Sequence, residues 1–146
     1  MADISGNYTL DYKISSTPGG VPLDRDNFIF NPLGFKARAS LTWSIDRYKA
    51  RAVLNYVGGY KNNLPEPDQN VSSFTPVDLN FWVNFGDPVG TGLSEGWVLG
   101  FLASNVFDED PPYVNVAPSG NGNGGYDSSA ANPIGRMFGI SLEKSF

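Results

Sequence analysis

The feature that most constrains the fold of this chain is a strict alternation of apolar and polar residues. It is clearest between residues 35 and 45, where Phe35, Ala37, Ala39, Leu41, Trp43 and Ile45 alternate with Lys36, Arg38, Ser40, Thr42 and Ser44. Successive side chains of a strand point to opposite faces, so the pattern predicts a strand with one apolar and one polar face. Helical spacing would group Phe35 with Arg38 and Ala39, which leaves no apolar stripe.

The alternation recurs along the chain and predicts an all-β fold, an antiparallel up-and-down meander of about six long strands. We place these strands at residues 4–15, 34–45, 48–60, 75–86, 95–106 and 135–146, within a single segment covering 1–146. Two links are short, Asp46–Arg47 and 87–95, whereas 16–33, 61–73 and 107–134 are long. Short and long links alternate, as do the periplasmic turns and extracellular loops of outer-membrane barrels.

Strand length and aromatic placement favour a transmembrane β-barrel over a soluble β-sandwich, which also alternates. The predicted strands have about ten to fourteen residues, whereas soluble strands cluster near five or six and membrane strands need about nine to eleven. Aromatic side chains lie near the strand ends on the apolar face, as in interfacial girdles. These residues are Phe35, Trp43, Tyr48, Tyr56, Phe85, Trp97, Phe107, Phe138 and Phe146.

The opposite face of the predicted strands is polar and suits a wide, hydrated lumen. Its candidate lumen-lining residues are Lys36, Arg38, Lys49, Arg51, Asp78 and Asn80. Two interpretations stay open for the four cations. They line a path for an anionic ligand, or they pair with carboxylates of the barrel or of a plug inside it.

Composition argues against several other classes of function. The chain has no cysteine and no histidine, which excludes zinc sites built on those residues and Ser-His-Asp triads. Its net charge is −5 and its ten basic residues are scattered, so we expect no nucleic-acid partner. No paired carboxylates or activated nucleophile indicate catalysis, so we predict neither an enzyme nor a bound cofactor or metal.

Three loop segments have the composition of ligand sites but fit solvated loops better. Asp108–Asp110 and Asp24–Asn27 supply oxygen atoms that Ca²⁺ prefers, yet each is typical of an exposed turn. Residues 119–125 are glycine-rich but lack the Gly-Lys-Ser/Thr ending of a phosphate loop. We expect such loops to need neighbouring loops or partners in order to become ordered.

The end of the chain carries two motifs in a fixed order. The first comprises Asn105, Phe107, Asp108, Pro111 and Pro112, and the second comprises Tyr126, Asp127, Asn132, Gly135, Arg136, Phe138 and Phe146. Both resemble the closing segments of TonB-dependent outer-membrane receptors. The terminal Phe146 resembles the aromatic signal by which outer-membrane barrels are recognised for insertion. From their places in the sequence, Asn105 and Asp108 are expected to cap a turn, and Arg136 to lie near the extracellular rim.

This resemblance implies that the chain is the C-terminal part of a barrel of about 22 strands in the outer membrane of a Gram-negative bacterium. The parent would import a siderophore complex, cobalamin or a glycan, with TonB acting through a plug that this sequence lacks. Its partners would be membrane lipid, the remaining strands and the plug. The start of the sequence shows no signal peptide. Six strands alone leave two open edges, so we do not expect transport by this chain alone. The alternative is a self-associating structural β protein, an oligomeric barrel or filament joined through these edges.

Overall fold

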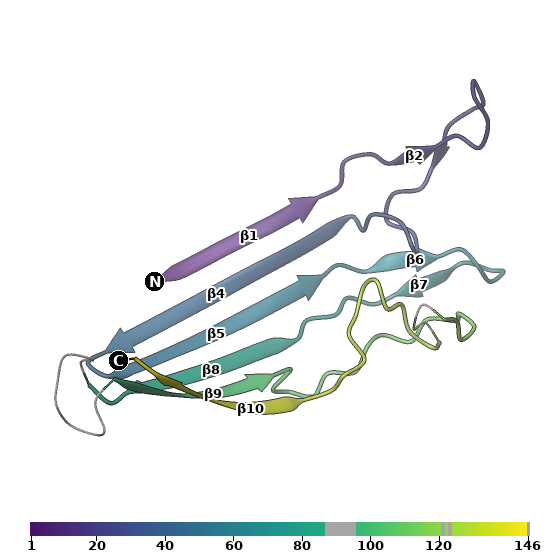
Figure 1. Cartoon of the computed structure of the whole chain (residues 1–146). Helices are drawn as coiled ribbons and strands as arrows, with labels where there is room; N and C mark the ends of the chain where they lie inside the picture. Colours follow the sequence, from purple (N-terminus) through teal and green to yellow (C-terminus); the bar gives the residue numbers. More distant parts are fainter. Residues whose placement is uncertain (87–95, 121, 123, 146) are drawn as a thin grey trace.

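A computed structural model of the chain describes residues 1–86, 96–120, 122 and 124–145, and these are all-β with no helix among them (Figure 1). Six strands form one antiparallel sheet in the order β1-β4-β5-β8-β9-β10. Their bounds are Ala2–Tyr8 (β1), Phe35–Ile45 (β4), Tyr48–Val57 (β5), Val77–Asn84 (β8), Trp97–Ser104 (β9) and Met137–Lys144 (β10). The described residues are therefore all-β, as predicted, and they contain a six-stranded antiparallel sheet; four further short strands form two small ribbons beside it.

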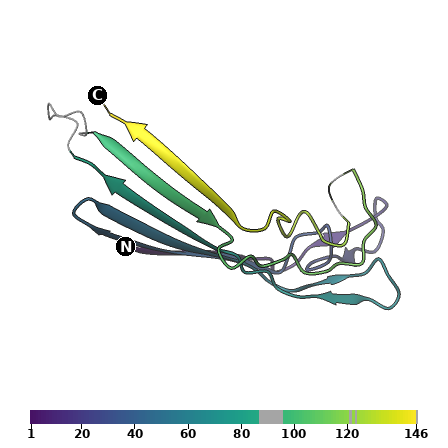
Figure 2. The same ribbon diagram turned by 90° about the horizontal axis from the view of Figure 1, so that it is seen from below.

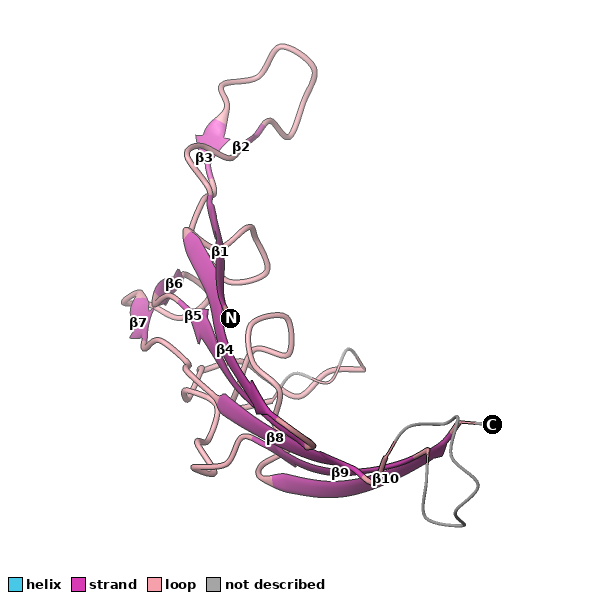
Figure 3. Ribbon diagram, turned by 90° about the vertical axis from the view of Figure 1, so that its left-hand side faces the viewer, coloured by secondary structure: helices cyan, strands magenta, loops and turns pink. Residues whose placement is uncertain are grey.

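The sheet is an open arc. Viewed nearly along the strands, it curves from β1 at one edge to β10 at the other (Figure 3). Both termini lie at one end of the sheet, and the links 16–33, 61–73 and 107–134 gather at the opposite end (Figure 1). The described residues include no helix that could cross a membrane.

The tight turn after β4 forms as predicted. Ile45 pairs directly with Tyr48, so Asp46 and Arg47 alone connect the two strands. Asp46 has a φ of 47°, a conformation that Asp adopts more readily than most residues and that matches a two-residue hairpin. The other predicted short link, 87–95, lies outside the described residues.

The first strand is shorter than predicted and shifted toward the N-terminus. We expected residues 4–15, but β1 ends at Tyr8, which pairs with the first residue of β4, Phe35. The last backbone hydrogen bond between the two segments runs from Thr9 N to Gly34 O (3.0 Å), and Thr9 Oγ1 also donates to Leu33 O (2.9 Å). The alternation continues beyond this point without a partner strand. Residues farther on instead form a small ribbon of β2 (Lys13–Ile14) and β3 (Leu23–Asp24).

The predicted strand 48–60 is divided into two elements. β5 ends at Val57, and after Gly58–Gly59 the chain leaves the sheet as β6 (Tyr60–Asn62), which pairs with β7 (Gln69–Val71). Gly59 allows this close approach, because a Cβ there would lie 2.9 Å from Val71 O. The other strands begin one or two residues later than predicted. β8 and β9 also end two residues earlier, next to the turn conformations of Gly86 (φ 127°) and Asn105 (φ 47°), and β10 ends at Lys144.

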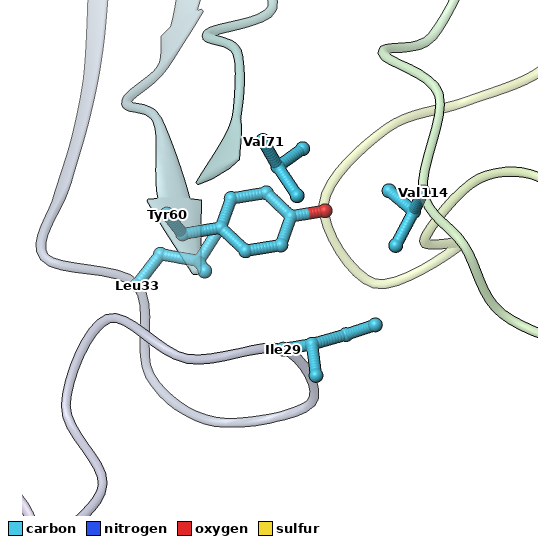
Figure 4. Packing of buried hydrophobic residues seen from close by; sticks show 5 residues of the cluster. All are labelled: Ile29, Leu33, Tyr60, Val71 and Val114. Carbon is cyan, nitrogen blue, oxygen red and sulfur yellow. The ribbon is translucent and has the colours of Figure 1, made fainter. Parts of the chain in front are cut away.

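The long links pack on one another at their end of the sheet (Figure 2). Their buried core comprises Ile29 and Leu33 before β4, Tyr60 of β6, Val71 of β7 and Val114 of the last long link (Figure 4). Ile29 and Val114 are only 2% and 1% exposed. Neighbouring loops thus supply the apolar contacts that no single glycine- and asparagine-rich loop contains.

Candidate functional site: a two-faced sheet and its loop clasp

The strand register places most apolar residues of the six strands on one face. One row across five strands contains Trp43, Ala50, Phe81, Phe101 and Ile140, and the next contains Ile45, Tyr48, Val83, Leu99 and Leu142. Many of these side chains are unusually exposed, for example Trp43 at 52% and Ile140 at 74%. Isolated surface residues need no explanation, but a contiguous apolar face of this extent marks a contact with lipid or protein.

This apolar face contains a hollow of about 680 Å³. The small side chains of Ala50, Ala52 and Ala103 lie beside it, and larger residues such as Trp43 and Phe138 form its sides. The hollow therefore forms where small side chains lie between large ones on a continuous sheet. Its lining is almost wholly apolar.

The opposite face is polar and carries the predicted lumen residues. Arg51 lies opposite Asn80 and Lys49 opposite Trp82, while Lys36 and Arg38 follow on β4. Side chains are more crowded here, since Ser40 and Val53 are buried although the apolar face is open. A curved sheet crowds the side chains on its inner side, so this difference places the polar face on the inside of the arc (Figure 3).

The four cations of this face have no carboxylate partner within the described residues. Arg51 donates from Nη2 to Ser40 Oγ at 3.2 Å, and its Nε is buried without a hydrogen-bond partner. Lys49 Nζ lies 5.4 Å from the centre of the Trp82 ring, a cation–π distance. The one acidic residue among the predicted lumen residues, Asp78, instead accepts from Asn55 Nδ2 (3.2 Å) and Asn105 N (3.0 Å). The part of the inner face formed by β4 and β5 therefore carries four cations and no carboxylate.

Asn105 organises the turn that follows β9. Its Oδ1 accepts from Glu109 N at 3.0 Å and its Nδ2 donates to Glu109 O at 2.9 Å, so the predicted cap forms. Its φ of 47° lies in the left-handed region, which Asn tolerates better than most residues. The Glu109 carboxylate in turn accepts from Thr75 N at 3.1 Å, which ties the turn to the start of β8.

Asp108 joins the same turn to the start of β10. Its Oδ1 accepts from Arg136 N at 2.7 Å, and its Oδ2 lies 3.7 Å from Arg136 Nη2. A Cβ at Gly135 would lie 2.7 Å from Asp108 Oδ1, so the contact needs glycine at this position. We call Asn105, Asp108, Glu109, Gly135 and Arg136 the clasp. The two sequence motifs thus meet in space.

The candidate Ca²⁺ segments use their polar side chains in hydrogen bonds within the chain. Asp108 and Glu109 bind different backbone N–H groups, and no cluster of three acidic side chains suited to a metal occurs among the described residues. Asn27 is likewise occupied, because its side chain binds Gly34 N and Gly59 O. The hydrogen bond between Asp24 and Asp26 lowers the pKa of Asp24 and raises that of Asp26.

The remaining motif residues lie outside the clasp. Asp127 is 1% exposed and its Oδ1 accepts from Ser129 N and Oγ, while Asn132 Oδ1 accepts from Ile134 N. Phe107 and Phe138 are 76% and 77% exposed, and Arg136 lies 6.0 Å from the Phe138 ring. Pro111, Pro112 and Tyr126 are half-buried in the long link. Phe146 lies outside the described residues.

Sequence reasoning missed a buried amide pair that fastens the third long link. Asn62 is 0% exposed, and its Nδ2 donates to Gln69 Oε1 (3.2 Å) and Asn115 O (3.0 Å). Gln69 Oε1 accepts from Asn115 N at 2.8 Å, and Gln69 Nε2 donates to Tyr113 O at 3.1 Å. These two side chains hold residues 113–115 against the β6–β7 ribbon. No alternation or motif marks them in the sequence.

Tyr60 is the most strongly perturbed titratable group of the loop end. Burial raises its pKa well above the usual range, and the nearby Asp127 carboxylate adds to the effect because it disfavours a second negative charge. The Tyr60 hydroxyl therefore stays neutral at physiological pH, and its ring belongs to the loop core (Figure 4).

Comparisons with protein-family models, with curated proteins and with solved structures gave no match for this chain.

Proposed function

We propose that this chain is a wall segment of an outer-membrane β-barrel of the TonB-dependent receptor type. In this proposal the apolar face contacts lipid, and the polar inner face lines the lumen. The clasp and the packed long links lie on the extracellular side. The parent receptor imports a siderophore complex, cobalamin or a glycan, and this chain contributes wall, loops and the closing strand.

The observation that carries the proposal is the exposed apolar face. It extends without a polar side chain through the rows of Trp43 and Ile45. In water an exposed apolar face of this extent promotes aggregation, whereas in a bilayer it is the expected exterior of a barrel. β4 has eleven residues, which at about 3.3 Å each and a tilt of about 45° span roughly 25 Å, the height of a barrel's apolar band.

The three tryptophans provide a test with an internal control. Trp43 lies on the apolar face and Trp82 on the polar face, so one single-tryptophan variant reports on each face. One variant carries Trp82→Phe and Trp97→Phe, and the other carries Trp43→Phe and Trp97→Phe. Both are reconstituted in phosphatidylcholine vesicles whose acyl chains are brominated.

We expect bromine to quench the Trp43 variant strongly and the Trp82 variant weakly, because quenching needs near contact with the acyl chain. Quenching of neither variant in vesicles that retain β-sheet circular dichroism would show that the apolar face does not meet lipid, and equal quenching of both would show that lipid does not distinguish the two faces. The proposal would then be abandoned.

A further inference from the structure

A single positive charge lies on the apolar face of the sheet. The structure describes every residue of the six strands, and their other charged residues all lie on the polar face. Lys144, the last residue of β10, instead pairs with Trp97 and shares the apolar face with Leu142. Its Nζ lies 5.3 Å from the centre of the Trp97 ring, a cation–π distance. An ammonium group on an apolar surface needs a polar layer within its reach.

Lys144 lies at the end of the sheet that is opposite the long links (Figure 1). The proposed function places those links on the extracellular side, so Lys144 lies at the headgroups of the periplasmic leaflet. Phe85 N donates to Trp97 O at 2.8 Å, which brings two large aromatic residues to the same level of the sheet. Aromatic residues at one level are typical of the interface between acyl chains and headgroups.

Two hollows extend from Lys144 along the apolar face. The nearer one has a volume of about 220 Å³ and is lined by Phe85, Trp97, Leu99 and Leu142. The next apolar-face residues of the same two strands, Phe101 and Ile140, line the hollow of about 680 Å³. Ile140 lies four residues from Lys144, which at about 3.3 Å each and a tilt of about 45° is roughly 9 Å of depth. One leaflet contains about 15 Å of hydrocarbon, so an acyl chain from the same leaflet reaches both hollows.

We infer that this end of β9 and β10 binds an anionic phospholipid, with its phosphate at Lys144 Nζ and an acyl chain in the two hollows. The inference rests on the proposed function, because it requires the apolar face to lie in a bilayer. The lysine and the phosphodiester have complementary charges, and a headgroup with a net negative charge is favoured over a zwitterionic one, whose own cation repels the lysine. These side chains project from the face of the sheet, so a further strand paired with β10 leaves the site open.

Tryptophan quenching compares the lipids at this site with those elsewhere on the same face. A variant with Trp43→Phe and Trp82→Phe keeps only Trp97, whereas the variant that keeps only Trp43 reports on β4. Each is placed in vesicles of phosphatidylglycerol and phosphatidylcholine in equal amounts. Bromine is present in the upper acyl chains of one lipid or of the other. The ratio of the two quenching efficiencies gives the relative binding of the two lipids at each tryptophan.

We expect phosphatidylglycerol to be favoured about fivefold at Trp97, the gain typical of one lysine near an anionic lipid, with little preference at Trp43. Lys144→Gln should abolish the preference at Trp97, and Lys144→Arg, which keeps the charge, should retain it. The matched control is Lys49→Gln, which should leave the preference unchanged. In the wild type Lys49 makes the same kind of ring contact with Trp82 (5.4 Å), but on the polar face.

An equal preference at Trp97 and Trp43 would show that anionic lipid gathers along the whole face, and would overturn the inference. So would no preference at Trp97, or a preference that survives Lys144→Gln in a variant that retains β-sheet circular dichroism. In each of these cases, strong quenching of Trp43 leaves the proposed function standing. If no brominated lipid quenches either tryptophan in a folded chain, the proposed function and the inference fail together.

Discussion

The carboxylate of Asp108 accepts a hydrogen bond of 2.7 Å from the backbone N–H of Arg136, across 28 residues of sequence. This contact joins the turn after β9 to the start of β10, and so sets where the last strand begins. It also explains why Asp108, Gly135 and Arg136 occur together in the sequence motifs.

Removal of the Asp108 carboxylate should destabilise the end of the sheet. We expect Asp108→Ala to lower the free energy of unfolding by about 1–3 kcal/mol, because a charge-assisted hydrogen bond is lost. Asp108→Asn should cost less, since its amide oxygen still accepts. Urea unfolding in micelles measures the difference. The control Asp110→Ala changes an exposed acid of the same segment and should have little effect.

A methyl group at Gly135 should also destabilise the end of the sheet, because it would crowd the Asp108 carboxylate. In Gly135→Ala the Cβ would stand 2.7 Å from Asp108 Oδ1, so the turn must shift. We expect a loss of about 1–3 kcal/mol in the free energy of unfolding, typical of overpacking. Gly120→Ala is the matched control, since nothing lies within 4 Å of its Cβ position. Equal stability of both variants would show that the turn carrying Asp108 can shift without a loss of stability.

Loss of the Asn62 amide should release the third long link. Asn62→Ala leaves Asn115 O and Leu64 N without their partner in a buried region, at a cost of about 1–3 kcal/mol for each unsatisfied group. We expect faster hydrogen exchange at the amides of residues 113–116 and quicker proteolysis within 107–134. Asn70→Ala, on the exposed side of the same ribbon, should change neither rate.

Alkaline pH should unfold the loop core before the sheet. The pKa of Tyr60 is raised in the folded state above an unfolded value of about 10. Its contribution to stability is therefore complete below pH 10 and is lost as the pH rises toward the folded pKa. Protease sensitivity of the long links should increase above about pH 10 in the wild type, and much less in Tyr60→Phe. An identical pH profile for both chains would assign the effect to another group.

The five later strands of the sheet were predictable because each carries a period-two pattern over about eight residues or more, although Trp97–Ser104 alternates least well. The end of β1 was not, because Leu10, Tyr12 and Ile14 continue the alternation although the partner strand β4 begins only at Phe35, opposite Tyr8. Strand length depends on the neighbour as well as on the strand's own residues. Likewise, the sequence motifs marked Asn105, Asp108 and Arg136, but the amide pair Asn62–Gln69 depends on contacts between distant links that no local pattern records.

The alternation of faces also determines where the length of this chain can vary. Because the side-chain period of a strand is two, one inserted or deleted residue within β4 or β8 would exchange inner and outer side chains beyond that point. The cations of β4 would then face the apolar side and Trp43 would turn inward. Length changes compatible with the sheet are therefore confined to pairs of residues within strands, or to the links between strands. Natural size variation among related chains should accumulate in these links.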